Sequence, residues 1–338
     1  MLDGIDPIEH RKAAKAERAL AAAKAMTFKD CAAAYIAANE GSWKNRVHAR
    51  QWTSTLKTYV YPKIGALSVA EIDTGLVLKC IEPIWATKTE TASRVRGRIE
   101  SILDWATVRK YHTGDNPARW GGHLEHVLPS KNKVAKPVHH AALPHQQIPA
   151  FMAALRTRQG TAARALEFTI LTAARTGEVI GAKRDEIDED NKTWTVPAGR
   201  MKAGKEHRVA LSERAIELLR DLPTESGNNH VFIGPTPGAG LSNMAMTAVL
   251  RRMGHGRITV HGFRSSFMDW CHECTSYPKV VIDMALAHTV GDKVEAAYRR
   301  GDLLKKRQAL AEAWARYCAA PPATGVVVPL RGKATADA

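Results

Sequence analysis

Residues 261–310 read HGFRSSFMDWCHECTSYPKVVIDMALAHTVGDKVEAAYRRGDLLKKRQAL, and they decide how the second half of the chain is interpreted. Apolar residues recur here at helical spacing, which predicts helices over about 262–273, 278–287 and 302–317. The same stretch contains four polar residues of the kinds that catalytic sites use, namely His261, Arg264, His288 and Tyr298. Taken one at a time, each has an ordinary structural explanation.

Two shorter polar segments precede this stretch. Arg175 and Glu178 follow an apolar helix that we predict over about 161–174. Lys202 lies in a glycine-bearing loop, a place where a lysine is usually only a solubilising residue. The strand-like runs around this loop are short and lie at 186–188, 193–196 and 207–211. Few short strands among many helices predict a mainly α fold with a small antiparallel sheet (α+β).

Residues 27–115 contain a succession of helical patterns, and we place the domain that they form at 27–129. Thr27 is placed to cap the first helix, and Ser68 starts a capping box that predicts another. A helix over about 90–110 has apolar residues on one face, and we assign its three arginines to the other face: Arg94, Arg96 and Arg98. We predict a small helical domain with these arginines as candidate DNA contacts, and a merely solvated face is the alternative interpretation.

Residues 130–141 (SKNKVAKPVHHA) lack periodicity and are typical of a basic interdomain linker. Their lysines, further candidate DNA contacts, are Lys131, Lys133 and Lys136. The second domain is predicted to span 142–320. We interpret residues 1–26 as a linker or helical extension, and 321–338, rich in Pro, Gly and Ala, as a disordered tail.

The charge of the chain indicates a polyanionic partner. Lys and Arg number 49 against 34 Asp and Glu, a formal net charge of +15 over 338 residues. Such a surplus favours contacts with nucleic-acid phosphates, and only 6% aromatic residues argues against base-stacking on single strands. Five cysteines without framework spacing indicate reduced thiols, and the sequence has no run of apolar residues that would span a membrane. We therefore expect a cytoplasmic, nucleoid-associated bacterial protein that binds duplex DNA.

Six of these residues occur in the order of the catalytic residues of the tyrosine recombinases: Arg175, Lys202, His261, Arg264, His288 and Tyr298. Their flanks HGFRSSF, LAH and AYRRGDLLKKRQAL are similar to those of phage and genomic-island integrases, and EHRVALS follows the lysine loop as in that family. The resemblance covers about residues 142–318 well. It implies a helical core-binding domain at 27–129 and a mixed α/β catalytic domain at 142–320.

The resemblance also implies a chemistry that suits these residue types. Tyr298 would attack a DNA phosphate, leaving a 3′-phosphotyrosine and a free 5′-hydroxyl. Because a phenol has a pKa of about 10, the tyrosyl ester can be reopened by another 5′-hydroxyl. Lys202 is the candidate general acid for the departing 5′-oxygen, and His261 the candidate base for the tyrosine.

The remaining residues would stabilise the transition state. Arg175 and Arg264 would clamp the two non-bridging phosphate oxygens with forked donors, so that no metal or other cofactor is required. His288 would add a further donor, and Glu178 would orient Arg175. The resemblance to integrases further implies that four protomers pair two double-stranded attachment sites and integrate or excise a mobile element. A DNA-bending protein and a directionality factor are the expected accessory partners.

Two other functions remain open at this point. One is a topoisomerase-like enzyme that relaxes DNA with the same tyrosine chemistry. The other is a DNA-binding regulator that has kept the fold and lost catalysis, although all six candidate residues are present. The helix over 302–317 likewise has two interpretations, since its apolar residues would pack either on their own domain or on a neighbouring protomer.

The sequence departs from the family pattern at its N-terminal end and at two internal positions, and it contains one competing signal for a metal site. The chain begins where we expect the usual N-terminal arm-binding domain to end, so that domain is expected to be lacking. Ala210 and Asp283 stand where proline and glutamate are expected, and we place both outside the catalytic site. Finally, Cys271-His272-Glu273-Cys274 suggests a zinc site, but no second ligand pair lies at suitable spacing, and we interpret the cysteines as packing residues.

Overall fold

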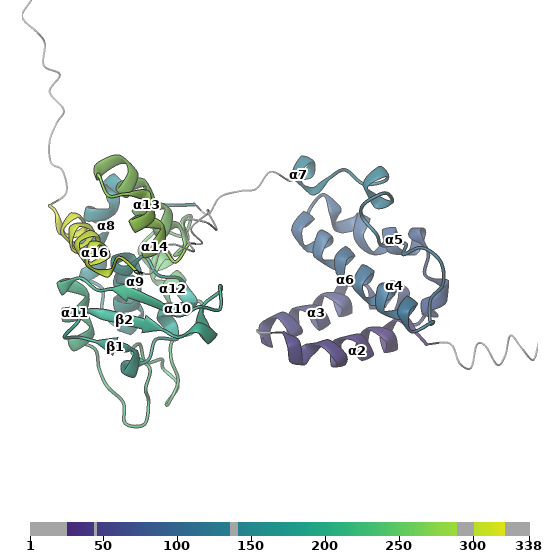
Figure 1. Ribbon diagram of the computed structural model, residues 1–338, viewed down its shortest axis with the longest axis horizontal. Coiled ribbons are helices and arrows are strands. Elements are labelled where there is room, and N and C mark those ends of the chain that lie inside the picture. Colours follow the sequence, from purple (N-terminus) through teal and green to yellow (C-terminus); the bar gives the residue numbers. More distant parts are fainter. Residues whose placement is uncertain (1–25, 44–45, 136–140, 289–300, 322–338) are drawn as a thin grey trace, which may run out of the picture. The chain divides into compact units, whose positions relative to one another are not determined.

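A computed structural model describes residues 26–43, 46–135, 141–288 and 301–321, which are drawn in colour in Figure 1. The chain divides into two compact units, Met1–Val138 and His139–Ala338. In the part of the chain that the structure describes, no helix has both the length and the apolar character needed to cross a membrane. Tyr298 and Lys136 lie outside the described residues, as do 1–25 and 322–338.

The described part of the first unit is helical and has its own hydrophobic core. Its α-helices are α2 (Phe28–Asn39), α3 (Arg46–Tyr59), α4 (Tyr61–Ile64), α5 (Thr74–Trp85), α6 (Thr89–Val108) and α7 (Lys131–Val134). The predicted cap is confirmed, because Oγ1 of Thr27 accepts the backbone N–H of Asp30 at 3.1 Å. Helix α6 turns Val95, Ile99 and Ile102 fully inward against this core.

The prediction of a helix that begins at Ser68 is wrong. Ser68 caps only a single 3-10 turn, Val69–Glu71, after which the backbone becomes extended at Ile72. The α-helix begins later, because Oδ1 of Asp73 accepts the N–H of Leu76 at 2.8 Å and so supplies the true N-cap of α5. A capping-box pattern thus identified a local turn and not the helix that follows it.

The second unit is built from helices around a three-stranded antiparallel sheet, which confirms the predicted fold class. The strands β1 (Ile187–Asp188), β2 (Thr193–Val196) and β3 (His207–Ala210) pair in chain order, with Trp194 opposite Val209. The α-helices are α8 (Ile148–Arg156), α9 (Thr161–Thr172), α10 (Thr176–Ile180), α11 (Glu213–Arg220), α12 (Ala245–Arg252), α13 (Gly262–Cys274), α14 (Lys279–Ala285) and α16 (Leu304–Ala319).

Helix α9 is the central element of the second unit. It packs against α8, α10, α11, α12, α13 and α16, and its last seven residues are all buried. The helix stops at Ala173, whose φ of 48° is in the left-handed region, so the chain turns sharply before Arg175. A buried helix therefore fixes the position of the first candidate catalytic residue.

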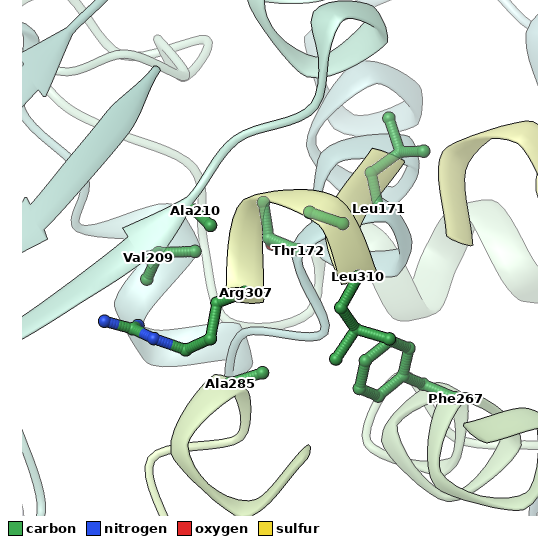
Figure 2. A pocket seen from close by; sticks show the side chains of 9 residues that line it. Leu171, Thr172, Val209, Ala210, Phe267, Ala285, Arg307 and Leu310 are labelled. Carbon is green, nitrogen blue, oxygen red and sulfur yellow. The ribbon is translucent and has the colours of Figure 1, made fainter. Parts of the chain in front are cut away.

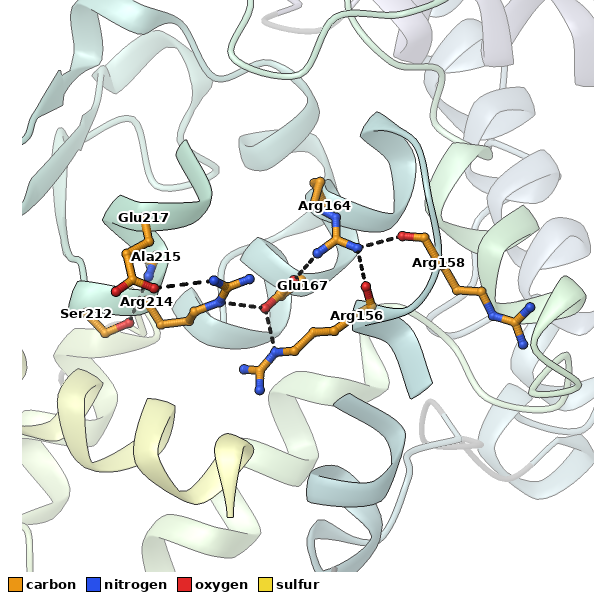
Figure 3. A network of polar contacts seen from close by, with 8 residues as sticks. All are labelled: Arg156, Arg158, Arg164, Glu167, Ser212, Arg214, Ala215 and Glu217. Carbon is orange, nitrogen blue, oxygen red and sulfur yellow. Dashed lines mark hydrogen bonds and ion pairs between the residues drawn. The ribbon is translucent and has the colours of Figure 1, made fainter. Parts of the chain in front are cut away.

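A buried carboxylate in the middle of α9 joins three helices, as Figure 3 shows. Glu167 is 0% exposed, and its oxygens lie 2.9 Å from Nε of Arg156, 2.8 Å from Nη1 of Arg164 and 3.1 Å from Nε of Arg214. Since these arginines belong to α8, α9 and α11, one side chain links all three helices. The pairing satisfies a charge that would otherwise be very costly to bury.

Helix α16 packs on its own unit, which decides between the two interpretations of this segment. Leu310 and Trp314 are 0% exposed, and Nε1 of Trp314 donates to the carbonyl of Ile170 at 2.8 Å. The Trp314 ring also packs edge-on against Phe267 and at a tilt against Trp270, both of α13. The apolar face of α16 is thus part of the domain core.

Candidate active site

Arg175 stands at the N-cap of α10 and is held by Glu178. The Glu178 carboxylate accepts both the backbone N–H of Arg175, at 2.9 Å, and its Nη1 group, at 2.7 Å. Nη2 of Arg175 points toward the carbonyl of Ala287 at 3.4 Å, across 112 residues of sequence. Glu178 is 4% exposed, so the guanidinium is oriented by a group that solvent does not reach freely.

Arg264 lies in the first turn of α13 and is buried, with 6% of its surface exposed. Its Nη1 donates to the carbonyl of Ala173, and its Nη2 donates to the carbonyl of Leu286 at 2.7 Å. Burial, followed by the charge of Arg175, lowers the pKa of Arg264 to about 10. The side chain therefore remains charged at neutral pH while neutral backbone groups hold it.

His288 lies beside Arg264, just beyond the end of α14. Its Nε2 is 3.4 Å from Nη2 of Arg264, and its Nδ1 is 3.5 Å from Oδ1 of Asp283. Partial burial and then the charge of Arg264 lower the pKa of His288 below its ordinary value, so the ring is neutral at pH 7. Arg264 can only donate, which places the proton of the neutral ring on Nδ1, toward Asp283.

The prediction that Asp283 lies outside the site is wrong. Asp283 contacts the His288 ring, its carbonyl accepts the backbone N–H of His288 at 2.9 Å, and its Oδ2 pairs with Lys279 at 2.5 Å. The available signal was its predicted place in the last turn of a helix, five residues before His288.

Lys202 lies exposed in the turn between β2 and β3. The base of this turn is firmly held, since Nη1 of Arg200 donates to the carbonyl of Glu178 at 2.9 Å and Met201 is only 7% exposed. The N–H of Gly204 closes the turn on the carbonyl of Met201 at 3.0 Å. Lys202 itself makes no ion pair or hydrogen bond with any residue that the structure describes. A fixed base with a projecting lysine suits a group that engages its target from outside.

His261 is the N-cap residue of α13, one turn before Arg264, and its carbonyl accepts the N–H of Arg264 at 3.1 Å. Gly262 follows because the chain passes very close here: a Cβ at this position would lie 2.3 Å from the carbonyl oxygen of Ala141. The start of the second unit therefore packs against the turn that carries His261 and Arg264.

The structure thus brings Arg175, Glu178, Arg264 and His288 directly together. It also reveals His207 on β3, which the sequence interpretation did not single out. Burial, and then the charge of Arg307, lowers the pKa of His207 to about 4, and a backbone hydrogen bond links it to Ala285. Its position in EHRVALS was the available signal, because that segment follows the Lys202 turn.

The candidate DNA contacts of the first unit are more mixed. Arg98 is wrong as a DNA contact: it is 5% exposed, lies 5.4 Å from the Trp52 ring and donates to the carbonyl of Gln51 at 2.9 Å. Arg96 is also engaged, with Glu100 at 2.7 Å and the carbonyl of Ala118 at 2.7 Å.

The other three candidates that the structure describes lie at the surface. The side chain of Arg94 is 60% exposed and that of Lys131 is 52% exposed, and both contact Glu90. Lys133 is exposed as well. These three side chains remain available to a partner.

Residues 271–274 do not assemble metal ligands. Cys271 is buried, and Glu273 is engaged with the ring of His145 at 2.9 Å. Among the residues that the structure describes, no group of three or more His, Cys, Asp or Glu side chains could hold a metal ion.

Sequence comparison identifies the family. Residues 141–302 match the phage integrase family, and residues 28–123 match the phage integrase central domain. The prophage integrase IntZ of Escherichia coli K12 is 34% identical over 317 residues, which cover 93% of this chain and 76% of that protein. The chain belongs to the phage integrase family of tyrosine recombinases. It is accordingly a site-specific recombinase of the tyrosine type.

Other members and solved structures agree with this assignment. The integrase of Enterobacteria phage P4 is 28% identical, over 94% of this chain and 74% of its own length. A lambda integrase tetramer bound to a Holliday junction shares the fold of this recombinase, with a TM-score of 0.62 and 15% identity over 87% of this chain and 86% of that one. The Tn1549 transposon integrase with circular intermediate DNA gives a TM-score of 0.59 at 13% identity, over 82% of this chain and 96% of that one.

Proposed function

We propose that this recombinase cleaves and rejoins duplex DNA through a covalent 3′-phosphotyrosyl intermediate on Tyr298. The observation that carries the proposal is the convergence of Arg175, Arg264 and His288 from three segments of the chain. Arg175 faces the carbonyl of Ala287, Arg264 donates to the carbonyls of Ala173 and Leu286, and His288 contacts Arg264. Two guanidinium groups at one place suit the two non-bridging oxygens of a phosphodiester, where negative charge concentrates in the transition state.

In the proposed step, the phenolic oxygen of Tyr298 attacks phosphorus and forms a new P–O bond. The bond from phosphorus to the 5′-oxygen breaks, and that oxygen takes a proton from Lys202. The phenolic proton passes to His261. Rejoining reverses each transfer, with a 5′-hydroxyl as the attacking group. Arg175, oriented by Glu178, and Arg264 hold the phosphate throughout.

The neutral ring of His288 refines its proposed role. With Nε2 accepting from Arg264, the ring holds that guanidinium in place and is itself held by Asp283. Donation from Nε2 to a phosphate oxygen would follow when the ring takes up a second proton, or when the Nδ1 proton moves to Nε2 as DNA binds.

We further propose that four copies pair two attachment sites, as the lambda integrase tetramer on a Holliday junction suggests. The exposed basic side chains Arg94, Lys131 and Lys133 are proposed contacts to the DNA backbone, together with Lys136. A DNA-bending protein and a directionality factor would decide between integration and excision.

Covalent trapping tests the proposal. The parent protein and Tyr298→Phe are incubated with DNA from the flanks of the gene, nicked near the cleavage site to prevent religation, with a chelator present. We expect a protein–DNA adduct on a denaturing gel with the parent alone. An adduct with both proteins would show that another residue is the nucleophile. If neither protein forms an adduct on these flanks or on randomised nicked DNA, although both bind it, the proposed phosphotyrosyl intermediate is wrong for this chain.

A further inference from the structure

The described structure resumes at Gly301, and the next residue, Asp302, lies four residues beyond Tyr298 and contacts two arginines. Oδ2 of Asp302 lies 3.0 Å from Nη2 of Arg307 and 3.2 Å from Nη1 of Arg208. Oδ1 of the same carboxylate accepts the backbone N–H of Leu304 at 3.1 Å. Both oxygens of Asp302 are therefore engaged, one at the start of α16 and one with the two guanidinium groups.

Arg307 is the buried member of this group, with 3% of its surface exposed. Its Nε donates to the carbonyl of Asp302 at 2.8 Å, and its Nη1 donates to the carbonyl of Arg208. Figure 2 shows the side chain leaving α16 beside Val209, with Ala210 next along β3. One forked guanidinium thus joins the residue that follows the Tyr298 segment to the middle of strand β3.

Strand β3 begins directly after the turn that carries Lys202. Its first residue is His207, and the base of the turn is anchored through Arg200 on Glu178, the partner of Arg175. Arg307 therefore stands where two chain segments meet: one leads back four residues to Tyr298, and the other leads back six residues from Arg208 to Lys202.

The geometry points to Arg307 and Asp302 as a pair of positioning residues. They fix Asp302, the point from which the chain leads back to Tyr298, relative to the strand that follows the Lys202 turn. This inference rests on the proposed roles of Tyr298 and Lys202. The reason for such a device is that the nucleophile and the general acid must act on opposite sides of one phosphorus atom. A displacement of about 1 Å at a reacting group can slow a reaction ~100-fold.

If Asp302 only capped helix α16, it would need fewer contacts than the structure gives it. To begin α16, Asp302 needs only one oxygen on the N–H of Leu304. The second oxygen instead contacts Arg307 and Arg208. In addition, Nη1 of Arg307 donates to the backbone carbonyl of Arg208 on β3. One of the three contacts of the Asp302 side chain, that with Arg208, thus reaches β3 and adds nothing to the helix cap.

The test compares Asp302→Asn with the parent and with Lys202→Ala in single-turnover cleavage at saturating nicked DNA. Asparagine keeps the cap acceptor and the size of the side chain but removes the charge that both arginines contact. Each protein is also given DNA in which sulfur replaces the 5′-bridging oxygen. Since a thiol has a pKa of about 8.5, a thiolate departs without a general acid.

We expect Asp302→Asn to form adduct ~10- to 100-fold more slowly than the parent on both substrates, because sulfur does not restore the position of the nucleophile. Lys202→Ala should be slow on the oxygen substrate and recover on the sulfur substrate. Glu213→Gln is the matched control, since it removes a surface carboxylate of similar exposure that pairs with Lys192 at 2.5 Å. Its rates should equal those of the parent.

Arg307→Lys is a second variant, which keeps a charge near Asp302 and loses the fork. It should show the same slowing on both substrates with unchanged DNA affinity. The positioning role is overturned if Asp302→Asn cleaves within twofold of the parent, if sulfur restores its rate, or if its defect follows loss of DNA binding or of folding. An adduct with Tyr298→Phe would instead overturn the proposed nucleophile, and the positioning role with it.

Discussion

Replacing Glu167 by glutamine tests whether the buried ionic network holds the second unit together. Glutamine has the size of glutamate but only one acceptor oxygen, so its NH₂ group must face at least one arginine N–H. The three arginines would keep their charges while 22–32% of each side chain is exposed. Breaking a buried pair typically costs 3–5 kcal/mol, and because these partners reach some solvent we expect about 3 kcal/mol.

For a unit of this size, such a loss lowers the melting temperature by roughly 6–12 °C. Differential scanning calorimetry of the full chain would measure it as a shift in the transition of the second unit. Glu189→Gln is the control, because it removes a carboxylate that also pairs with an arginine, Arg220 at 2.8 Å, but at the surface. A Glu167→Gln shift no larger than that of the control would refute the reasoning and make the network energetically neutral.

Three further outcomes follow from described contacts. Because the pKa of His207 is about 4 in the folded chain, acidification from pH 6.5 toward 4 should favour the unfolded chain by up to about 3 kcal/mol. Urea unfolding at pH 7 and 4.5 measures this, and His207→Asn should flatten the pH dependence; an unchanged slope would contradict it. Arg98→Leu should destabilise the first unit by about 1–3 kcal/mol in thermal melts, with the DNA affinity of the folded protein unchanged; weaker binding at unchanged stability would argue the reverse. Arg264→Lys should slow adduct formation at least ~100-fold with DNA binding retained, since lysine cannot bridge two carbonyls and a phosphate; a loss below threefold would contradict the clamp.

The sequence predicts those members of the candidate site that contribute their side chains. Arg175, Arg264 and His288 are recognisable only together, because their order and flanking segments resemble those of the tyrosine recombinases. The groups that hold Arg264 are not recognisable in this way, since the carbonyls of Ala173 and Leu286 carry no residue-type signature. Only the fold brings these two segments together.

The local sequence pattern also determines which face of α6 carries Arg98, and our prediction of the outer face is wrong. Arg98 follows Val95 by three residues and precedes Ile102 by four, which places it on the buried stripe of α6 and not on the opposite face. By contrast, the Asp302–Arg307 contact with β3 spans almost a hundred residues of sequence. No local pattern encodes such a pairing.

The anchoring of the two candidate catalytic arginines, Arg175 and Arg264, on main-chain oxygens has a consequence for divergence. Every amino acid supplies the same carbonyl, so replacing the side chain at position 173, 286 or 287 removes no acceptor from the arginines. What these positions must preserve is backbone shape, including a φ of 48° at Ala173 and 49° at Ala287. Substitutions at these three positions are therefore limited by the backbone conformation that they must allow and not by the chemistry of the side chain. This agrees with the 15% identity to lambda integrase within one fold.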